Sequence, residues 1–145
     1  MAENAGKHTF FLRVIAADRV FFMGKCTYVV LPAVDGEHAI MAHHSDMMIA
    51  TDTGTIRFQT EDGEWQEAVV GTGFTQVINN RVTILVEFAE RPDEIDELRA
   101  REAKERAEEQ LRQKQSQQEY YHTQASLARA MARLRMTNKN NINRK

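Results

Sequence analysis

The sequence has little cysteine and proline, and it contains no long apolar run. Cys26 is the single cysteine, so an intramolecular disulfide is excluded and a reducing compartment is favoured. We expect this thiol to be a small buried strand residue. No apolar stretch approaches the roughly 20 residues that a membrane-spanning helix needs. Residues 1–8 lack the apolar segment of a secretory signal, so we predict a flexible tail there.

Glycine is absent from the last part of the chain. All seven glycines lie at or before Gly73, and of the two prolines only Pro92 lies beyond residue 90. Alanine, glutamate and arginine become frequent from the same point onward. This shift in composition predicts a β-domain at residues 9–91 and a separate helical segment at residues 92–145.

The charge is also unevenly distributed along the chain. Residues 1–91 carry 7 basic and 12 acidic side chains, and residues 92–109 carry 4 basic and 8 acidic ones. Residues 110–145 carry 8 basic side chains and a single acidic one, Glu119. The formal net charge of −2 therefore hides a basic end that is suited to an anionic partner.

Residues 10–88 alternate between apolar and polar side chains in short segments. The pattern predicts strands near residues 10–15, 20–23, 26–31, 40–41, 47–49, 55–59, 65–70, 74–78 and 82–88. Glycine at position 24 and proline at position 32 are expected to end strands. Turn signals at near-regular spacing favour an antiparallel β-sandwich or a flattened barrel. No segment between the strands is long enough for a helical crossover, so parallel pairing is not expected.

The period changes after the last strand to that of a helix. We predict helices at about residues 93–113 and 119–137, with Asp93 as the cap of the first. The apolar stripes are expected at Ile95, Leu98, Ala103, Ala107 and Leu111, and at Tyr120, Leu127, Met131 and Leu134. Alanine-rich faces favour an antiparallel hairpin. The predicted fold class is α+β in sequence order, with a sandwich followed by a two-helix hairpin.

Several residues that suggest enzyme or metal chemistry have a simpler interpretation. His38, His43 and His44 lack carboxylates or thiols at ligand spacing, so a polar loop is expected there and not a metal site. Gly71 and Gly73 match half of a dinucleotide-binding fingerprint, but a strand pattern follows instead of a helix. We find no catalytic arrangement and predict that the chain is not an enzyme and requires no cofactor.

The arginines of the helical segment form a more informative pattern. Arg99 and Arg106 are seven residues apart, and Arg129 and Arg133 are four apart, so each pair shares a helical face. In a closed hairpin these guanidinium groups would converge near Asp96, and guanidinium forks suit phosphate oxygens. The alternative is an ordinary solvated face with pairs such as Glu102 and Arg106.

Five short segments, in this order, resemble the epsilon subunit of F-type ATP synthases. They are the Gly36-Glu37 turn with His44 downstream, Gly54-x-Ile56-Arg57, Gly71-x-Gly73-Phe74-x-x-Val77, Asn80-x-Val82-Thr83-Ile84-Leu85, and the alanine- and arginine-rich hairpin. The resemblance covers about residues 9–136. One departure is Ala42-His43, where the family usually has Pro-Gly.

The resemblance implies a non-catalytic central-stalk subunit. It would couple proton-driven rotation to ATP synthesis, with the sandwich bound to the gamma subunit and the c-subunit ring. The complex would lie at the cytoplasmic face of the bacterial plasma membrane. An extended hairpin would reach the alpha/beta catalytic head and inhibit ATP hydrolysis, with contacts from Arg129, Arg133 and Arg135.

Some bacterial members of this family bind ATP on the folded hairpin through an I/L-D-x-x-R-A motif. Here Ile95, Asp96, Arg99 and Ala100 match that motif. The supporting positions implied by the resemblance are Glu90, Arg106, Arg129 and Arg133. ATP would then be a regulatory ligand.

Two alternatives remain open. The hairpin would inhibit hydrolysis without sensing ATP, or the chain would be an unrelated β-sandwich adaptor whose basic helix binds nucleic acid. The second predicts steeply salt-dependent binding. It is disfavoured because Tyr120 and Tyr121 are the only aromatic residues among the basic ones.

Overall fold

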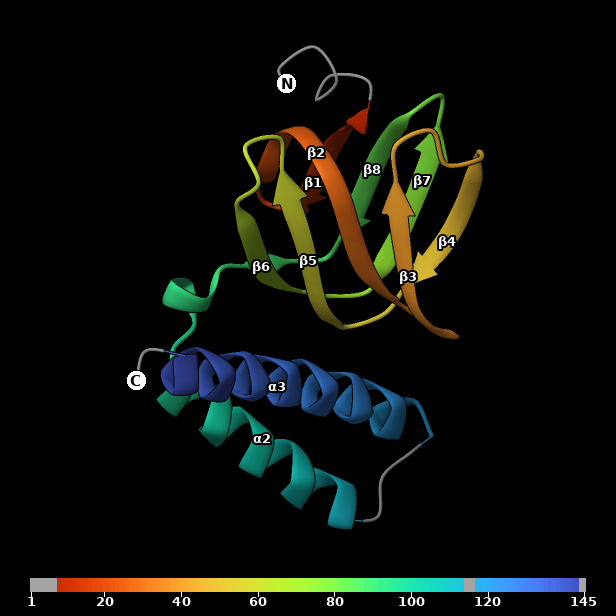
Figure 1. Cartoon of the computed structure of the whole chain (residues 1–145). Helices are drawn as coiled ribbons and strands as arrows, with labels where there is room; N and C mark the ends of the chain where they lie inside the picture. Colours follow the sequence, from red (N-terminus) through yellow and green to blue (C-terminus); the bar gives the residue numbers. More distant parts are fainter. Residues whose placement is uncertain (1–7, 114–116, 144–145) are drawn as a thin grey trace. The chain divides into compact units, whose positions relative to one another are not determined.

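The computed structural model of the chain describes residues 8–113 and 117–143. The chain separates into two compact units, one that ends at Glu90 and one that begins at Arg91 (Figure 1). The fold class predicted from the sequence, a mostly antiparallel sandwich followed by a helical hairpin, is confirmed. The flexible tail predicted for residues 1–8 lies, apart from His8, outside the described residues.

The first unit is a single curled sheet. Its strands are β1 (Phe10–Ala16), β2 (Val20–Ala33), β3 (Gly36–Met41), β4 (Met47–Thr51), β5 (Gly54–Thr60), β6 (Trp65–Val70), β7 (Gly73–Ile78), β8 (Arg81–Val86) and β9 (Ala89–Glu90). Hydrogen bonding connects them in the order β1-β8-β7-β4-β2-β5-β6-β9, and β3 pairs with β2. Because β1 also pairs with β2, the sheet closes on itself as a flattened barrel with two facing layers (Figure 1).

The core lies between these layers and follows the alternation seen in the sequence. In β1, Phe10, Leu12 and Val14 are buried, and the intervening Arg13 donates to Thr83 Oγ1 of β8 over 3.0 Å. Cys26 is fully buried, and desolvation raises the pKa of its thiol to about 12. The thiol is therefore a structural side chain and not a nucleophile at neutral pH.

Strand β2 differs from the prediction, because residues 20–23 and 26–31 belong to one strand. Gly24 pairs directly with Leu12 of β1, and the Phe22 ring lies over the place where a Cβ would be. An aromatic ring above a strand glycine supplies the packing that glycine lacks. Pro32 also lies within β2, where it faces Glu37 of β3. The pairing of β2 with β5 shifts register between Cys26 and Tyr28, so an irregularity of this long strand lies there and not at Gly24 or Pro32.

One strand pair is parallel, which the sequence did not lead us to expect. β1 and β8 pair in parallel from Phe11 with Arg81 to Ala16 with Val86. The prediction considered only crossovers between neighbouring strands. In this fold the connection between β1 and β8 is the whole run from β2 to β7, which carries the chain around the barrel and back.

Asn80 holds together the turns at one end of the barrel. The β7–β8 turn, Asn79-Asn80, has positive φ at both residues (51° and 63°), as a two-residue hairpin turn requires. The Asn80 Oδ1 atom accepts the His43 backbone N–H over 2.7 Å, and its Nδ2 donates to the Thr9 carbonyl over 2.9 Å. His43 itself has φ of 63°, a conformation that glycine adopts most readily. The loop thus keeps the backbone form expected for the glycine that the family usually has there.

The second unit is a pair of helices that follow a short turn. It contains the 3-10 turn η2 (Pro92–Glu94) and the helices α2 (Glu97–Arg112) and α3 (Gln117–Asn143), which pack side by side (Figure 1). α2 begins four residues later than the predicted residue 93, and α3 extends beyond the predicted residue 137. Within residues 8–113 and 117–143, no helix combines the length and apolar character needed to cross a bilayer.

The apolar stripes of the helices also differ from the prediction. Leu98 is 67% exposed, whereas Ala100 and Ala107 are only 5% and 3% exposed. On α3 the predicted Tyr120 and Met131 are exposed, and the buried residues are Thr123, Ala130, Ala132 and Met136. Apart from Met136, the buried positions hold small side chains, because alanine lets helices approach closely. The prediction looked for large apolar residues and so did not find these positions.

Candidate functional site

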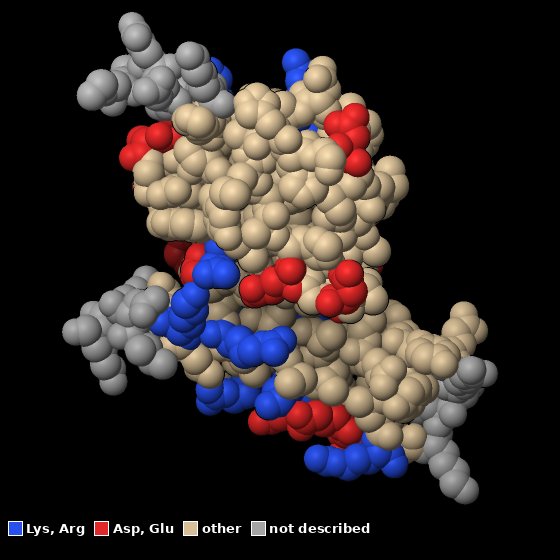
Figure 2. Space-filling model, turned by 45° about the vertical axis from the view of Figure 1, so that its right-hand side comes forward, with Lys and Arg blue, Asp and Glu red and all other residues tan. Residues whose placement is uncertain are grey.

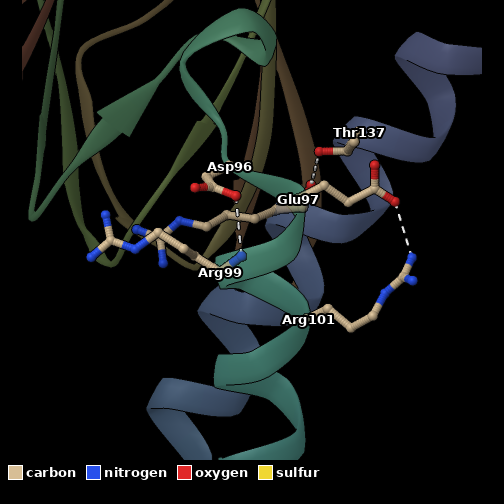
Figure 3. A network of polar contacts seen from close by, with 6 residues as sticks. Asp96, Glu97, Arg99, Arg101 and Thr137 are labelled. Atoms are coloured by element: carbon tan, nitrogen blue, oxygen red, sulfur yellow. Dashed lines mark hydrogen bonds and ion pairs between the residues drawn. The ribbon is translucent and has the colours of Figure 1, made fainter.

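Three residues define where α2 starts: Pro92, Ile95 and Asp96. Pro92 opens the 3-10 turn, and Ile95 then leaves helical geometry with φ of −87° and ψ of 125°. Asp96 is the N-cap, since its Oδ1 atom accepts the Arg99 backbone N–H over 3.2 Å (Figure 3). The Asp96 carbonyl accepts the first helical hydrogen bond, from Ala100 N–H, over 3.0 Å. The predicted cap, Asp93, lies inside the 3-10 turn and caps no α-helix.

The basic residues of α2 fall into two groups. Arg101, Lys104 and Arg112 each form an ion pair within the helix, with Glu97, Glu108 and Glu109 at 3.0, 3.8 and 3.0 Å. Arg99 and Arg106 form no ion pair with any residue in the described ranges, and both are exposed. The alternative pairing of Glu102 with Arg106 is not seen; Arg106 Nε instead donates to the Glu102 carbonyl over 3.4 Å. The two arginines singled out by spacing are thus the ones whose charge is uncompensated.

The arginines of α3 have few acidic neighbours along their own helix. Glu119 is the only acidic residue in α3, and it lies ten residues before Arg129. Arg129 is half-buried, and its Nη2 donates to Ser126 Oγ over 3.0 Å. Arg133 is half-buried as well, and its carbonyl accepts from Thr137 Oγ1 over 3.0 Å. Arg135 is exposed. On the hairpin, basic and acidic groups cover much of the surface seen in Figure 2.

A groove of about 440 Å³ runs between the two helices. Its lining combines charged, polar and apolar side chains: Arg101, Lys104, Glu105, Glu108, Met131, Leu134, Arg135 and Asn138. Two of its basic residues, Arg101 and Lys104, are already ion-paired. None of Arg99, Arg106, Arg129 and Arg133 lines it, so this groove is not the predicted phosphate site.

The residues that line this groove show which parts of the two helices lie side by side. Residues 101–108 of α2 line it together with residues 131–138 of α3. Because the helices run antiparallel, Arg106 lies at about the level of Arg133. Arg129 lies roughly one turn further from the start of α2. The hairpin therefore brings Arg106 and the α3 arginines to neighbouring levels, while Arg99 lies about two turns nearer the start of α2.

The remaining predicted residues have clear structural positions. Ala100 is buried, and Ile95 is half-buried at the junction before α2. Glu90 ends β9, where it pairs with Val69 of β6 and so belongs to the sandwich unit.

No other candidate site emerges from the residues tested above. His38 contacts Asp35 over 3.0 Å, and His44 Nδ1 lies 2.8 Å from the Ser45 carbonyl. Among the residues that the structure describes, no three His, Cys, Asp or Glu side chains gather at metal-binding distance. Gly71 and Gly73 flank the start of β7, where a Cβ on Gly73 would lie 1.8 Å from the Leu85 carbonyl oxygen. Close strand packing therefore accounts for this glycine.

Sequence reasoning missed that Asp96 caps α2 and that Asn80 links three segments. The first had a visible signal, since an aspartate three residues before Arg99 has the spacing from N-cap to N3. The second had none, because its partners Thr9 and His43 are distant in sequence.

Comparison with protein-family models places the fold in a known group. Residues 9–92 match the model "ATP synthase, Delta/Epsilon chain, beta-sandwich domain". Residues 93–138 match the model "ATP synthase, Delta/Epsilon chain, long alpha-helix domain".

Curated relatives named "ATP synthase epsilon chain" align with most of the chain. The one from Ruminiclostridium cellulolyticum is 46% identical over 131 residues, which cover 90% of this chain and 97% of the relative. The one from Caldicellulosiruptor bescii is 42% identical and covers 90% and 95% of the two chains. The one from Syntrophomonas wolfei is 36% identical and covers 96% and 98%.

Solved structures share the fold at low sequence identity. A chain of the Euglena gracilis mitochondrial ATP synthase (OSCP/F1/c-ring) superimposes with a TM-score of 0.75 at 19% identity, over 86% of this chain and 78% of that one. A central stalk/c-ring chain of the Tetrahymena thermophila mitochondrial enzyme gives a TM-score of 0.64 at 11% identity, over 88% and 95%.

Proposed function

This chain belongs to the delta/epsilon family of ATP synthase subunits, and we propose that its helical hairpin is an ATP-sensing regulator. The chain is an epsilon-type subunit of the central stalk and carries no catalytic sites. In the folded hairpin, ATP binds to the arginines of α2 and α3. When the hairpin opens, the basic α3 contacts the catalytic head and blocks hydrolysis.

The uncompensated charge of Arg99 and Arg106 is the observation that carries the proposal. Other basic residues on α2 are ion-paired within the helix, while these two are left exposed at a seven-residue spacing. Such guanidinium groups suit a polyphosphate, because each can donate two parallel hydrogen bonds to phosphate oxygens. With Arg129 and Arg133 from α3, they supply positive charge from both helices, so the ligand would join the helices together.

ATP then acts as a stabiliser of one hairpin state. A ligand that binds only the folded hairpin stabilises it by RT ln(1 + [ATP]/Kd), which is about 1.4 kcal/mol at ten times Kd. That free energy shifts the population of a balanced two-state hairpin about tenfold, and it has little effect on one that strongly favours either state.

Binding of ATP to the isolated chain tests the sensing function. We expect saturable binding by calorimetry, with at least a tenfold loss in Arg99→Ala and in Arg129→Ala. Arg101→Ala is the matched control: it removes an arginine from the same helix, but one that is already paired with Glu97. No saturation at millimolar ATP, or an equal loss in the control, would refute ATP sensing.

Inhibition by the hairpin is a separate proposal, supported by the net charge of +7 over residues 110–145, from 8 basic and 1 acidic side chains. Arg129, Arg133 and Arg135 would meet acidic loops of the alpha/beta head. The sandwich would bind the gamma subunit and the c ring, at the cytoplasmic face of the membrane. Truncation after Arg91 should raise ATP hydrolysis by the reconstituted complex. If truncation raises hydrolysis but ATP leaves the hairpin unchanged, the hairpin inhibits without sensing.

A further inference from the structure

Asp96 uses its carboxylate to hold the first turn of α2. Its Oδ1 atom accepts the backbone N–H of Arg99, which is the third helical residue, N3. This is the standard contact of an N-cap side chain. The residue that Asp96 caps is thus one of the two arginines proposed to bind phosphate.

The neighbouring motif residues also occupy positions that define a helix start. Ile95 is N′, the residue before the cap, and Ala100 is N4, the fourth residue of the helix. Apolar residues at N′ and N4 commonly pack together as a hydrophobic staple, which fixes the direction in which the chain enters the helix. Ala100 is buried, so it offers almost no surface to a ligand. Asp96 is therefore the cap and Arg99 an exposed first-turn residue, while Ile95 and Ala100 occupy the positions at which a staple forms.

We propose that Asp96 is a positioning residue for nucleotide binding: it fixes the first turn of α2 and thereby the direction of Arg99, and it is not itself a phosphate ligand. The inference rests on the proposed ATP site. Charge supports it, because a carboxylate placed beside the phosphates would repel them. Position supports it too, because Arg99 lies in the first turn, which frays most readily, whereas Arg106 lies two turns further along.

Four substitutions of Asp96 separate capping from charge. Asp96→Ser and Asp96→Asn keep a good cap without the charge, Asp96→Glu keeps the charge on a side chain that caps poorly, and Asp96→Ala keeps neither. We expect Ser and Asn to retain ATP affinity within about twofold, and Ala and Glu to lose about fivefold, as the free energy of one cap implies. Loss in Ser and Asn with retention in Glu would overturn the proposal, as would unchanged affinity in all four.

A double-mutant cycle tests whether Asp96 acts through Arg99. Combining Asp96→Ala with Arg99→Ala should cost no more affinity than Arg99→Ala alone, because the direction of a missing side chain is irrelevant. Combined with Arg106→Ala, the two losses should multiply. If both combinations multiply, Asp96 does not act through Arg99.

Amide hydrogen exchange provides a readout that needs no nucleotide. Exchange at the Arg99 amide should be several-fold faster in Asp96→Ala and Asp96→Glu than in the unmodified chain, and unchanged in Asp96→Ser and Asp96→Asn. Equal protection in all variants would overturn the positioning role. If even the unmodified chain binds no ATP, the proposed function fails, and exchange alone then decides whether Asp96 holds the helix start.

Discussion

At the scale of single residues, Asn80 connects three segments of the sandwich through its side chain. We expect Asn80→Ala to lower the free energy of unfolding by about 2–3 kcal/mol. The variant loses two side-chain hydrogen bonds, and alanine tolerates the positive φ at this position less well than asparagine does. Urea denaturation measures the loss.

Asn80→Gly is the matched control, because glycine tolerates a φ of 63° but cannot form the two side-chain bonds. It should recover about 1 kcal/mol of the loss. Equal stability of the two variants would mean that backbone strain contributes nothing at this turn.

The arginines show what residue spacing predicts and what it does not. The seven-residue spacing of Arg99 and Arg106 predicted a shared helical face. It did not reveal that Arg101 is paired and Arg99 is not, because Glu97 and Glu102 are both close enough in sequence to pair with several arginines. Which glutamate pairs with which arginine depends on the side-chain rotamers that the helix backbone allows.

At the scale of helices and strands, the hairpin depends on small residues. Ala107→Leu should weaken the packing of α3 on α2, because the added atoms have no space at a buried alanine. Amides along α3 should exchange at least tenfold faster than in the unmodified chain. Gln110→Leu, which adds a leucine at an exposed position of the same helix, should leave them unchanged. Equal protection in both variants would contradict close alanine packing.

Element boundaries were predicted best where local chemistry decides them. The alternation of β1 located its buried face, and the Asn79-Asn80 turn was visible as a break between two strand patterns. The long β2 was divided incorrectly at Gly24, because the Phe22 ring that covers this glycine and its pairing with Leu12 are tertiary contacts. The start of α2 was misplaced for a different, local reason, since Asp93 and Asp96 are equally good caps by residue type.

At the scale of the whole molecule, the sandwich should fold without the hairpin. Every residue of its main core cluster lies between Phe10 and Ala89. A fragment of residues 1–91 should therefore unfold in one cooperative thermal transition, followed by circular dichroism.

The matching fragment of residues 92–145 should be less stable than the sandwich and melt over a broader temperature range, because α2 has 16 residues, is largely exposed, and is held mainly by its packing on α3. A helical fragment that melts above the sandwich, or a sandwich that melts without cooperativity, would contradict this division of stability.

The parallel pairing of β1 with β8 has a consequence for synthesis on the ribosome. Phe11 meets Arg81 and Ala16 meets Val86, so the barrel cannot close until its last long strand has emerged. Contacts between residues so distant in sequence make folding slow. Until β8 has been synthesised, β1 can pair only with β2, and its other edge stays exposed to non-native strand pairing. The local helices that follow should form within microseconds once they emerge.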